Sequence, residues 1–383
     1  MASLAAAALV ALALSLRRQR SARRRLPSED SVAAASLAED LQRLFVGRLE
    51  RIAPSAAKFT PASWLRAGGA HGGGTRYETT RGVAFNRASV NVSAVHFESR
   101  VKYPIDSATA FSVILHPRNP HAPSMHFHLS FVESRRGGAY WRLIADLNPS
   151  ISDPAGAATF SAAVAGASGL TPALHAASCD FGERYFYIAP LERHRGAAHF
   201  FAASVRDSEL DAAQARVLGR SLATRVLEAY AALVECAVAA HPETTLSAAE
   251  WAAQRAYHTV YFFQVLLLDR GTTYGVLAHA DNDVGTLGSL PSLIDADLLE
   301  SWRPLLPAPQ DELLDAVLSA LELAPTRGQI NDAVRQALAD ALRAHYKSHP
   351  EAKDLQAEFD LPRWNAQAEE RIAAATATAA RCR

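Results

Sequence analysis

The chain has 383 residues, of which 49% are hydrophobic and 20% are charged. This composition supports a sizeable core and excludes a mainly disordered chain, which needs low hydrophobicity and high net charge. The 39 basic residues balance the 39 acidic ones, so no global field draws the chain onto nucleic acid, and we expect no nucleic-acid partner. Cys179, Cys236 and Cys382 are too widely spaced to predict a disulfide framework or a cysteine-based zinc site. We therefore expect an enzyme of a reducing compartment that acts on a small molecule.

The first 29 residues differ in character from the rest of the chain. Residues 1–16 are almost wholly apolar, and six arginines follow between positions 17 and 25. The apolar run is shorter than the ~20 residues that a membrane-spanning helix needs. An apolar stretch followed by an Arg/Ser-rich, acid-free stretch is typical of a targeting leader. We predict a leader over residues 1–29 that directs the protein to a plastid or mitochondrion. The alternative is a short anchor, which would be its only membrane contact; without a targeting signal the protein would be cytoplasmic.

Hydrophobic periodicity places helices on both sides of a block rich in strands. Helices are expected over residues 31–49, 208–240, 245–255, 311–323 and 329–345. Strands are expected over residues 90–96, 111–115, 125–132 and 274–279, with a further strand pair formed by 185–188 and 199–203. The glycine run 72–74 reads as a flexible turn. This order predicts an α+β fold, with one domain over residues 30–345 and a loosely attached polar tail over 346–383.

The densest group of candidate functional residues lies between positions 112 and 130. His126 and His128 are two residues apart, so on a strand they point to the same face. Two imidazoles on one face could bind a metal if further ligands joined them, or one could face a pocket while the other is an edge histidine with satisfied hydrogen bonds. Asp146 lies where a strand passes into a loop. Its carboxylate could orient a cationic or N–H-bearing ligand, or cap a turn.

A second candidate segment, residues 192–196, is locally basic. Arg193 and Arg195 could meet a substrate carboxylate through the planar guanidinium fork, or belong to a solvated turn. The chain contains no Gly-x-Ser-x-Gly elbow, zinc-protease helix motif or catalytic Cys–His signature.

One long motif resembles a known family. Residues 112–127 read SVILHPRNPHAPSMHF, which is similar to the signature of the oxygen-dependent coproporphyrinogen III oxidases. Other segments resemble the same family in the same order along the chain: 72–74, 83–85, 90–95, 146–149, 185–189, 266–272, 274–275, 289–291 and Trp302. The resemblance covers roughly residues 37–305.

The resemblance implies a large, flat antiparallel β-sheet sandwiched between helices, and a homodimer. It also implies that the protein converts two propionates of a porphyrinogen substrate, coproporphyrinogen III, to vinyls by oxidative decarboxylation. This reaction would form protoporphyrinogen IX in heme or chlorophyll biosynthesis. Molecular oxygen would be the oxidant, with no metal and no organic cofactor. By the same resemblance, His126 is the proton donor and Asp146 holds the pyrrole N–H groups, as suits an acceptor-only carboxylate. Ser112, His128, Arg193 and Arg195 would bind the substrate.

The chain departs from the family's pattern at several of these motifs. Residues 128–130 read His-Leu-Ser instead of Asn-Tyr-Arg, 142–144 read Arg-Leu-Ile instead of Gly-Gly-Gly, and 190–193 and 281–284 also differ. A tetracarboxylate needs cationic partners when its charges leave water. Two alternatives therefore stand beside the active oxidase. One is a catalytically impaired paralogue that binds a tetrapyrrole or dimerises with an active oxidase. The other is a metal-dependent oxygenase that uses His126 and His128.

Overall fold

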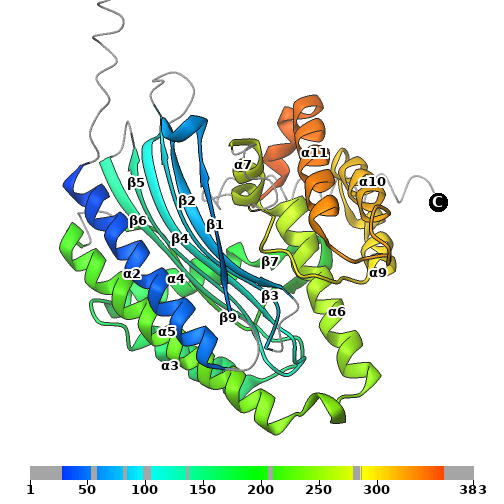
Figure 1. Cartoon of the computed structure of the whole chain (residues 1–383), viewed down its shortest axis with the longest axis horizontal. Helices are drawn as coiled ribbons and strands as arrows, with labels where there is room; N and C mark the ends of the chain where they lie inside the picture. Colours follow the sequence, from blue (N-terminus) through cyan, green and yellow to red (C-terminus); the bar gives the residue numbers. More distant parts are fainter. Residues whose placement is uncertain are drawn as a thin grey trace, which may run out of the picture.

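A seven-stranded antiparallel sheet lies between two groups of helices in the computed structural model (Figure 1). The structure describes residues 28–52, 58–80, 84–97, 105–134, 138–205, 210–278, 285 and 287–357. This architecture confirms the α+β fold with a single large sheet between helices. The predicted leader, apart from its last two residues, and the divergent segment 281–284 lie outside the described residues, as does most of the predicted tail.

The sheet is built almost entirely from consecutive hairpins. Its strands are β1 (Thr60–Leu65), β2 (Gly72–Thr80), β3 (Phe85–His96), β4 (Ile105–Pro117), β5 (Ser124–Ser134), β6 (Gly138–Asn148) and β9 (Ala198–Val205). They pair in the order β1-β2-β3-β4-β5-β6-β9, and every neighbouring pair is antiparallel. A two-stranded ribbon, β7 (Tyr187–Ile188) with β8 (Arg193–His194), lies outside this sheet.

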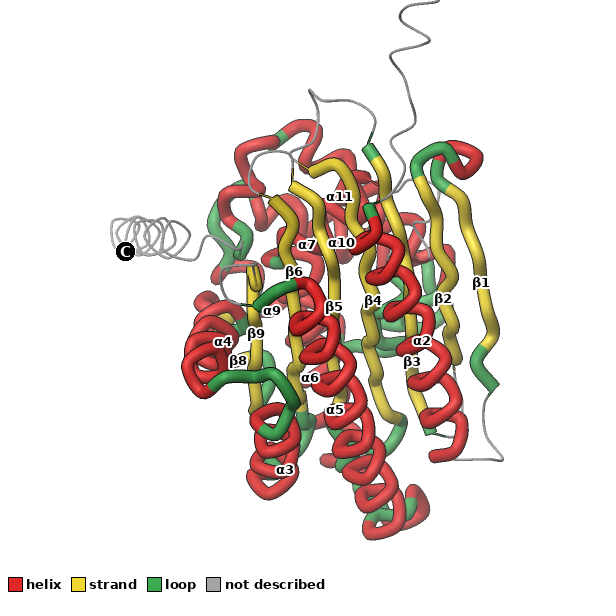
Figure 2. The backbone as a smooth tube through the Cα atoms, turned by 90° about the vertical axis from the view of Figure 1, so that its left-hand side faces the viewer, coloured by secondary structure: helices red, strands yellow, loops and turns green. Residues whose placement is uncertain are grey.

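One face of the sheet is covered by the first group of helices, as Figure 2 shows. This group consists of α2 (Glu29–Ile52), α3 (Pro154–Ala165), α4 (Pro172–Tyr185) and α5 (Ala212–Ala240). The predicted helix over 31–49 is confirmed by α2, which buries Leu37, Leu41, Phe45 and Leu49 at helical spacing. The Phe45 ring packs against Phe111 of β4 and Phe127 of β5, with centroid distances of 5.1 and 5.8 Å.

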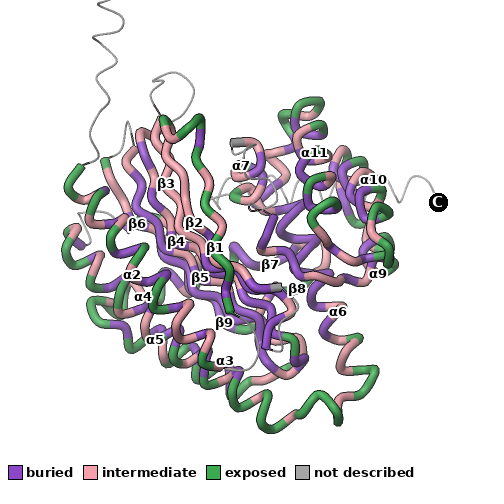
Figure 3. Tube along the Cα trace, viewed as in Figure 1, coloured by how far each residue is buried: buried purple, intermediate pink, exposed green. Residues whose placement is uncertain are grey.

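The second group of helices faces the other side of the sheet and has its own apolar core (Figure 3). Its longer elements are α6 (Ala248–Phe263), the π-helical η4 (Gln264–Leu268), α7 (Arg270–Ala278), α9 (Ala296–Ser301), α10 (Gln310–Leu321) and α11 (Asp332–Ser348). The described chain also contains short 3-10 turns in several connections: η1 (Ala67–Gly69), η2 (Ala189–Leu191), η3 (Glu243–Thr245), η6 (Arg303–Leu305) and η7 (Pro350–Leu355).

The strand predicted over 274–279 is wrong, because its described part belongs to helix α7. The Asp269 carboxylate accepts hydrogen bonds from the backbone N–H groups of Gly271 (3.3 Å) and Thr272 (3.0 Å), and from the Thr272 hydroxyl (2.7 Å). These bonds satisfy donors that a helix start leaves without partners. The β-prone residues of this segment are therefore overridden by a cap that lies just before them.

The turn predicted at Gly72–Gly74 is also wrong, because these glycines open strand β2. The indole of Trp64 in β1 lies directly over Gly74, where a Cβ atom would be 2.4 Å from Cζ2 of the ring. A Cβ atom on Gly73 would be 2.4 Å from the Trp64 carbonyl oxygen. The glycines thus allow close approach of β1 rather than a change of chain direction.

Two further expectations need correction near the sheet edge and at the C-terminal end. The segment 199–203 does not pair with 185–188: β9 pairs with β6, and Tyr187–Ile188 pairs with Arg193–His194. Helix α11 also runs through the predicted boundary at residue 345, and Gln356 is buried, with its Nε2 donating to Thr273 Oγ1 at 2.7 Å. The packed chain therefore continues to Ala357.

Candidate active site

The two faces of the central strands carry different chemistry. Along β5, Phe127 and Leu129 point into the apolar core, whereas His126, His128 and Ser130 alternate onto the opposite face. The prediction that His126 and His128 share a face is confirmed. The register then aligns two polar rows across the sheet. One row runs Ile114, His126, Asp146, His199, and the other runs Asn91, Ser112, His128, Ile144, Phe201.

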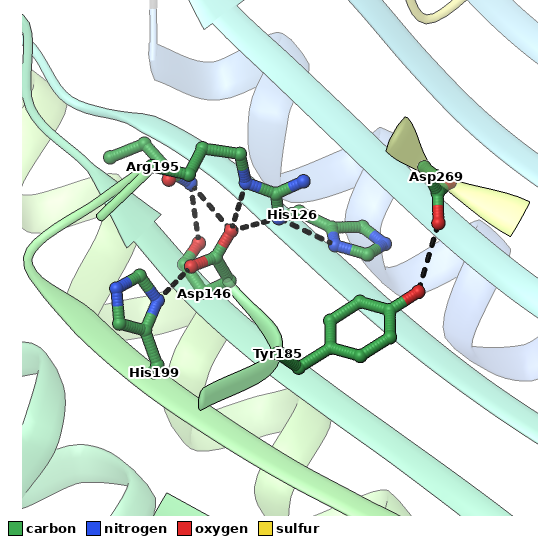
Figure 4. Close-up of polar contacts among 7 residues, drawn as sticks. His126, Asp146, Tyr185, Arg195, His199 and Asp269 are labelled. Atoms are coloured by element: carbon green, nitrogen blue, oxygen red, sulfur yellow. Dashed lines mark hydrogen bonds and ion pairs between the residues drawn. The ribbon is translucent and has the colours of Figure 1, made fainter. Parts of the chain in front are cut away.

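Asp146 is the centre of the first row and is completely buried, with 0% of its surface exposed. Its Oδ1 accepts a hydrogen bond from His199 Nδ1 at 2.5 Å (Figure 4). Its Oδ2 accepts from Asn148 Nδ2 at 2.9 Å, from Arg195 Nε at 3.1 Å and from Arg195 Nη2. Burial alone would raise the pKa of Asp146, but Arg195 and His199 outweigh it and hold this pKa well below its ordinary value. The carboxylate is therefore a permanent buried anion.

Arg195 reaches Asp146 because the chain crosses the end of β6 at a glycine. A Cβ atom on Gly196 would lie 2.5 Å from the Leu147 carbonyl oxygen and 2.3 Å from the Asn148 side chain. The Arg195 guanidinium then lies over the ring of Phe186, 4.2 Å from its centroid, and 5.4 Å from the centroid of Tyr261. Burial would lower the pKa of Arg195, but Asp146 outweighs this effect and raises it. Aromatic rings and one carboxylate thus fix a buried cation in a single orientation.

His126 lies beside this ion pair, and its Nδ1 accepts a hydrogen bond from Arg195 Nη2 at 3.3 Å (Figure 4). Burial and the neighbouring Arg195 lower the pKa of His126 to about 4, against the opposing influence of Asp146 and Asp269. The imidazole is therefore neutral at neutral pH. Because Nδ1 is the acceptor, the ring proton lies on Nε2, which becomes the donor available to a ligand.

His128 in the second row is held by two serine hydroxyls. Ser112 Oγ lies 2.7 Å from its Nδ1, and Ser130 Oγ lies 3.0 Å from its Nε2. Burial, His126 and Arg142 together lower the pKa of His128 to about 3. Each ring nitrogen of this neutral histidine already has a partner, and Ser112 is placed directly across the strand pair from it.

A tyrosine–aspartate pair borders the His126 side of the site. The Tyr185 hydroxyl donates to Asp269 Oδ1 at 2.9 Å, and burial followed by Asp269 raises the pKa of Tyr185 well above its ordinary value (Figure 4). Asp269 also caps α7, so one carboxylate joins the end of α4 to the start of α7.

The structure brings together three of the predicted site residues, His126, Asp146 and Arg195, and places Ser112 and His128 in the adjacent row. Arg193 is not part of this group, because it lies exposed on β8. Sequence reasoning missed His199, Asn148, Tyr185 and Asp269. The alternation of β9 could have placed His199 on the polar face, but no local signal pairs Tyr185 with a residue 84 positions away.

Within the described part of the chain, no group of three or more His, Cys, Asp or Glu side chains is arranged to hold a metal ion. None of the described helices is both long enough and apolar enough to span a membrane.

Comparison with known proteins identifies the family. The family model described as coproporphyrinogen III oxidase matches residues 33–319. The oxygen-dependent coproporphyrinogen-III oxidase of a Synechococcus species is 28% identical over 349 residues, covering 80% of this chain and 93% of that protein. The enzyme of Rickettsia akari is 28% identical over 257 residues, covering 61% of this chain and 84% of its own length. The mitochondrial enzyme of Homo sapiens is 27% identical over 260 residues, covering 61% of this chain, and the match spans 55% of the human protein's length. A buried Arg–Asp–His cluster on the polar face of this sheet thus lies in a chain that belongs to the coproporphyrinogen III oxidase family.

Proposed function

We propose that the protein catalyses the oxygen-dependent oxidative decarboxylation of coproporphyrinogen III to protoporphyrinogen IX. Membership of the family supports the substrate class. The observation that carries the proposal is the cluster of Arg195, Asp146 and His126, which combines a buried cation, a buried anion and a neutral imidazole on one polar face. Such fixed charges act strongly where water is excluded.

The chemistry needs an electron acceptor rather than a strong base. Each propionate loses CO2, one proton and two electrons as it becomes a vinyl group. Molecular oxygen takes up the two electrons with two protons, one from the substrate and one from solvent, to give hydrogen peroxide, so the step balances without a metal or organic cofactor. We propose that no such cofactor takes part, and that the enzyme works as a homodimer in an organelle, with membrane contact at most through its N-terminal segment.

The polar face would supply charge placement. Loss of electrons leaves positive charge on a pyrrole, which the Asp146 carboxylate would stabilise from beneath. Arg195 would hold that carboxylate in place and set the tautomer of His126, whose Nε2–H would donate a hydrogen bond to the reacting propionate. The resemblance implies a proton donor at His126, and a ring kept neutral by burial suits a hydrogen-bond donor better than an imidazolium acid. Ser112 and His128 would contact the neighbouring part of the ring.

The test is turnover of anaerobically prepared coproporphyrinogen III by the full-length protein, treated with chelator and then exposed to oxygen. The expected result is protoporphyrinogen with consumption of oxygen and release of CO2. Activity that returns only after a metal is added would contradict the proposal that no metal takes part. Failure to convert either this substrate or its monovinyl intermediate would overturn the proposed activity.

A catalytically impaired paralogue is the second candidate, and one observation favours it. Both oxygens of Asp146 already accept hydrogen bonds from Arg195, His199 and Asn148, and no part of this residue is exposed. A pyrrole N–H would have to displace one of these donors. This candidate predicts that coproporphyrin III quenches the protein's tryptophan fluorescence while coproporphyrinogen III is not converted.

A further inference from the structure

Arg335 carries donor groups for which the described residues provide no acceptor. It lies on α11 with 2% of its surface exposed, and its Nη2 pairs with Asp332 Oδ1. Its Nε and Nη1 are shielded from solvent, and no described residue accepts a hydrogen bond from either atom. Leaving a buried polar group without a partner is costly, and more so when the group is charged. Native proteins seldom keep such groups without a function, and binding of an anion is one such function.

Two more buried arginines lie near Arg335, on the polar face of the sheet. Arg87 of β3 is 3% exposed and donates from Nη2 to the Ile330 carbonyl oxygen at 3.0 Å, which joins the sheet to the segment just before α11. Arg76 of β2 is 5% exposed and pairs with Glu78 at 2.9 Å. Arg335 first, and then Arg87 and Arg76, lower the pKa of Asp332 despite the opposing effect of burial. The three guanidinium groups are therefore close enough to share one electrostatic environment.

Within this arginine cluster, Arg335 has a single counter-ion among the described residues, Asp332, which meets only one of its guanidinium nitrogens. Asp332 is itself largely exposed, since 76% of its side-chain surface faces solvent, so water weakens its hold on Arg335. A carboxylate would complete the set through charge-assisted hydrogen bonds.

The arginine cluster is continuous with the candidate active site. The register pairs Arg76 with Asn91, Asn91 with Ser112, and Ser112 with His128, in one row across four strands. Neighbouring strands lie ~4.8 Å apart, so the row places Arg76 about 14 Å from His128 along the sheet. The buried Oδ1 of Asn91, one strand away from Arg76 in this row, also has no hydrogen-bond partner among the described residues. A flat tetrapyrrole bearing carboxylates on opposite sides is the kind of ligand that such a row can accommodate.

We propose that Arg335, with Arg87 and Arg76, forms a carboxylate site that binds the propionates on the side of the porphyrinogen away from His126. The inference rests on the proposed function and names the residues that hold the remote end of its substrate. Helix α11 lies beyond residue 319, where the family match ends. The chain would thus supply from helix α11 a cationic contact that its signature motif lacks at residue 130.

The test compares two porphyrins that differ in the number of carboxylates. Binding of coproporphyrin III, with four free carboxylates, and of its tetramethyl ester, with none, is followed by tryptophan fluorescence quenching of the full-length protein. Arg335→Gln is expected to weaken coproporphyrin III binding about tenfold, as the loss of one hydrogen bond to a charged group predicts. Binding of the ester should change much less. Arg335→Lys, which keeps the charge, should recover part of the loss. Arg327→Gln is the matched control, because Arg327 lies on the surface of the same helical group with Asp297 and Glu300.

Three results would overturn the carboxylate site: unchanged coproporphyrin III binding in Arg335→Gln, equal loss for both porphyrins, or the same loss in Arg327→Gln. If the wild-type protein binds neither porphyrin, the proposed function fails instead, and succinate then tests the site separately. A rise in the melting temperature of the wild type with succinate, absent in Arg335→Gln, supports an anion site for another carboxylate. No rise in the wild type removes the site as well.

Discussion

The two faces of the sheet use the same strands for opposite purposes. On the face toward α2 and α5, aromatic rings such as Phe111 and Phe127 pack into a continuous apolar core. On the face toward the second group of helices, Asp146 is buried and His126 and Arg142 are partly buried, as polar or charged groups. Strand alternation alone separates the two chemistries.

This difference shows where stability and reactivity are located. Burial of apolar surface on the first face contributes free energy of folding. Buried charges on the second face gain less than their desolvation costs unless every partner is present. The polar face is therefore expected to serve ligand binding, whereas the apolar face contributes the free energy of folding.

Substitutions at two adjacent positions of β5 are expected to separate the two faces most clearly. Phe127→Ala should lower the free energy of unfolding by ~3–5 kcal/mol, because it leaves a cavity beside Phe45 and Phe111. His126→Ala should cost far less stability but lower the rate about a hundredfold or more, as the loss of one preorganised donor predicts. Urea denaturation and single-turnover rates measure the two effects. Equal stability losses would show that the faces do not differ as described.

The next largest change in stability is expected at the ion pair between Arg195 and Asp146 on the polar face. Arg195→Met leaves the Asp146 charge buried with His199 and Asn148 alone, and should lower the free energy of unfolding by ~3–5 kcal/mol. Adding Asp146→Asn should restore part of this loss, because the buried charge is then gone. A double-mutant cycle measures the coupling. If the double variant is as unstable as the sum of the single variants, the pair contributes no specific interaction.

The histidines of the polar face predict a pH dependence. The folded pKa values of His126 and His128, about 4 and about 3, lie below the unfolded value near 6.5. The unfolded chain therefore binds more protons between these limits, so stability is full above pH ~6.5 and falls as the pH is lowered toward 4. His128→Gln should reduce this slope by about one proton, ~1.4 kcal/mol per pH unit. Urea midpoints between pH 4.5 and 7 test it, and an unchanged slope would mean that His128 is not held neutral.

Substitutions on the outer side of the first helical group should change the free energy of unfolding least. Arg48 of α2 joins Glu228 and Glu235 of α5, and both glutamates are largely exposed. Arg48→Ala should change the free energy of unfolding by at most ~1 kcal/mol, less at high salt. A loss comparable with that of Arg195→Met would contradict the distinction between exposed and buried charges.

Local patterns were enough to predict much of the fold. The helical spacing of Leu37, Leu41 and Phe45 identified α2, and the two-residue spacing of His126 and His128 placed them on one face. Helix α7 was missed because its start depends on the Asp269 carboxylate rather than on the propensity of the residues inside it.

The site could be predicted only where one motif contained it. Asp146 and Arg195 were identified separately, but their pairing across 49 positions follows from the crossing at Gly196. Whether Arg193 or Arg195 points inward is decided by the β7–β8 ribbon, which leaves Arg193 exposed. Such choices depend on tertiary packing, which no sequence periodicity encodes.

The order of the elements along the chain has a consequence for synthesis. The whole sheet and its first helices are complete by residue 240, whereas the helices that cover the polar face begin at Ala248. The backbone N–H of Ala357 donates to the Leu268 carbonyl oxygen at 2.8 Å, so this covering is fastened by the last described residue. While the remainder is still being translated, this face of the sheet would expose His126, His128 and Arg142 beside apolar residues such as Ile144 and Phe201. These polar side chains would lower the tendency of the incomplete protein to aggregate on the ribosome.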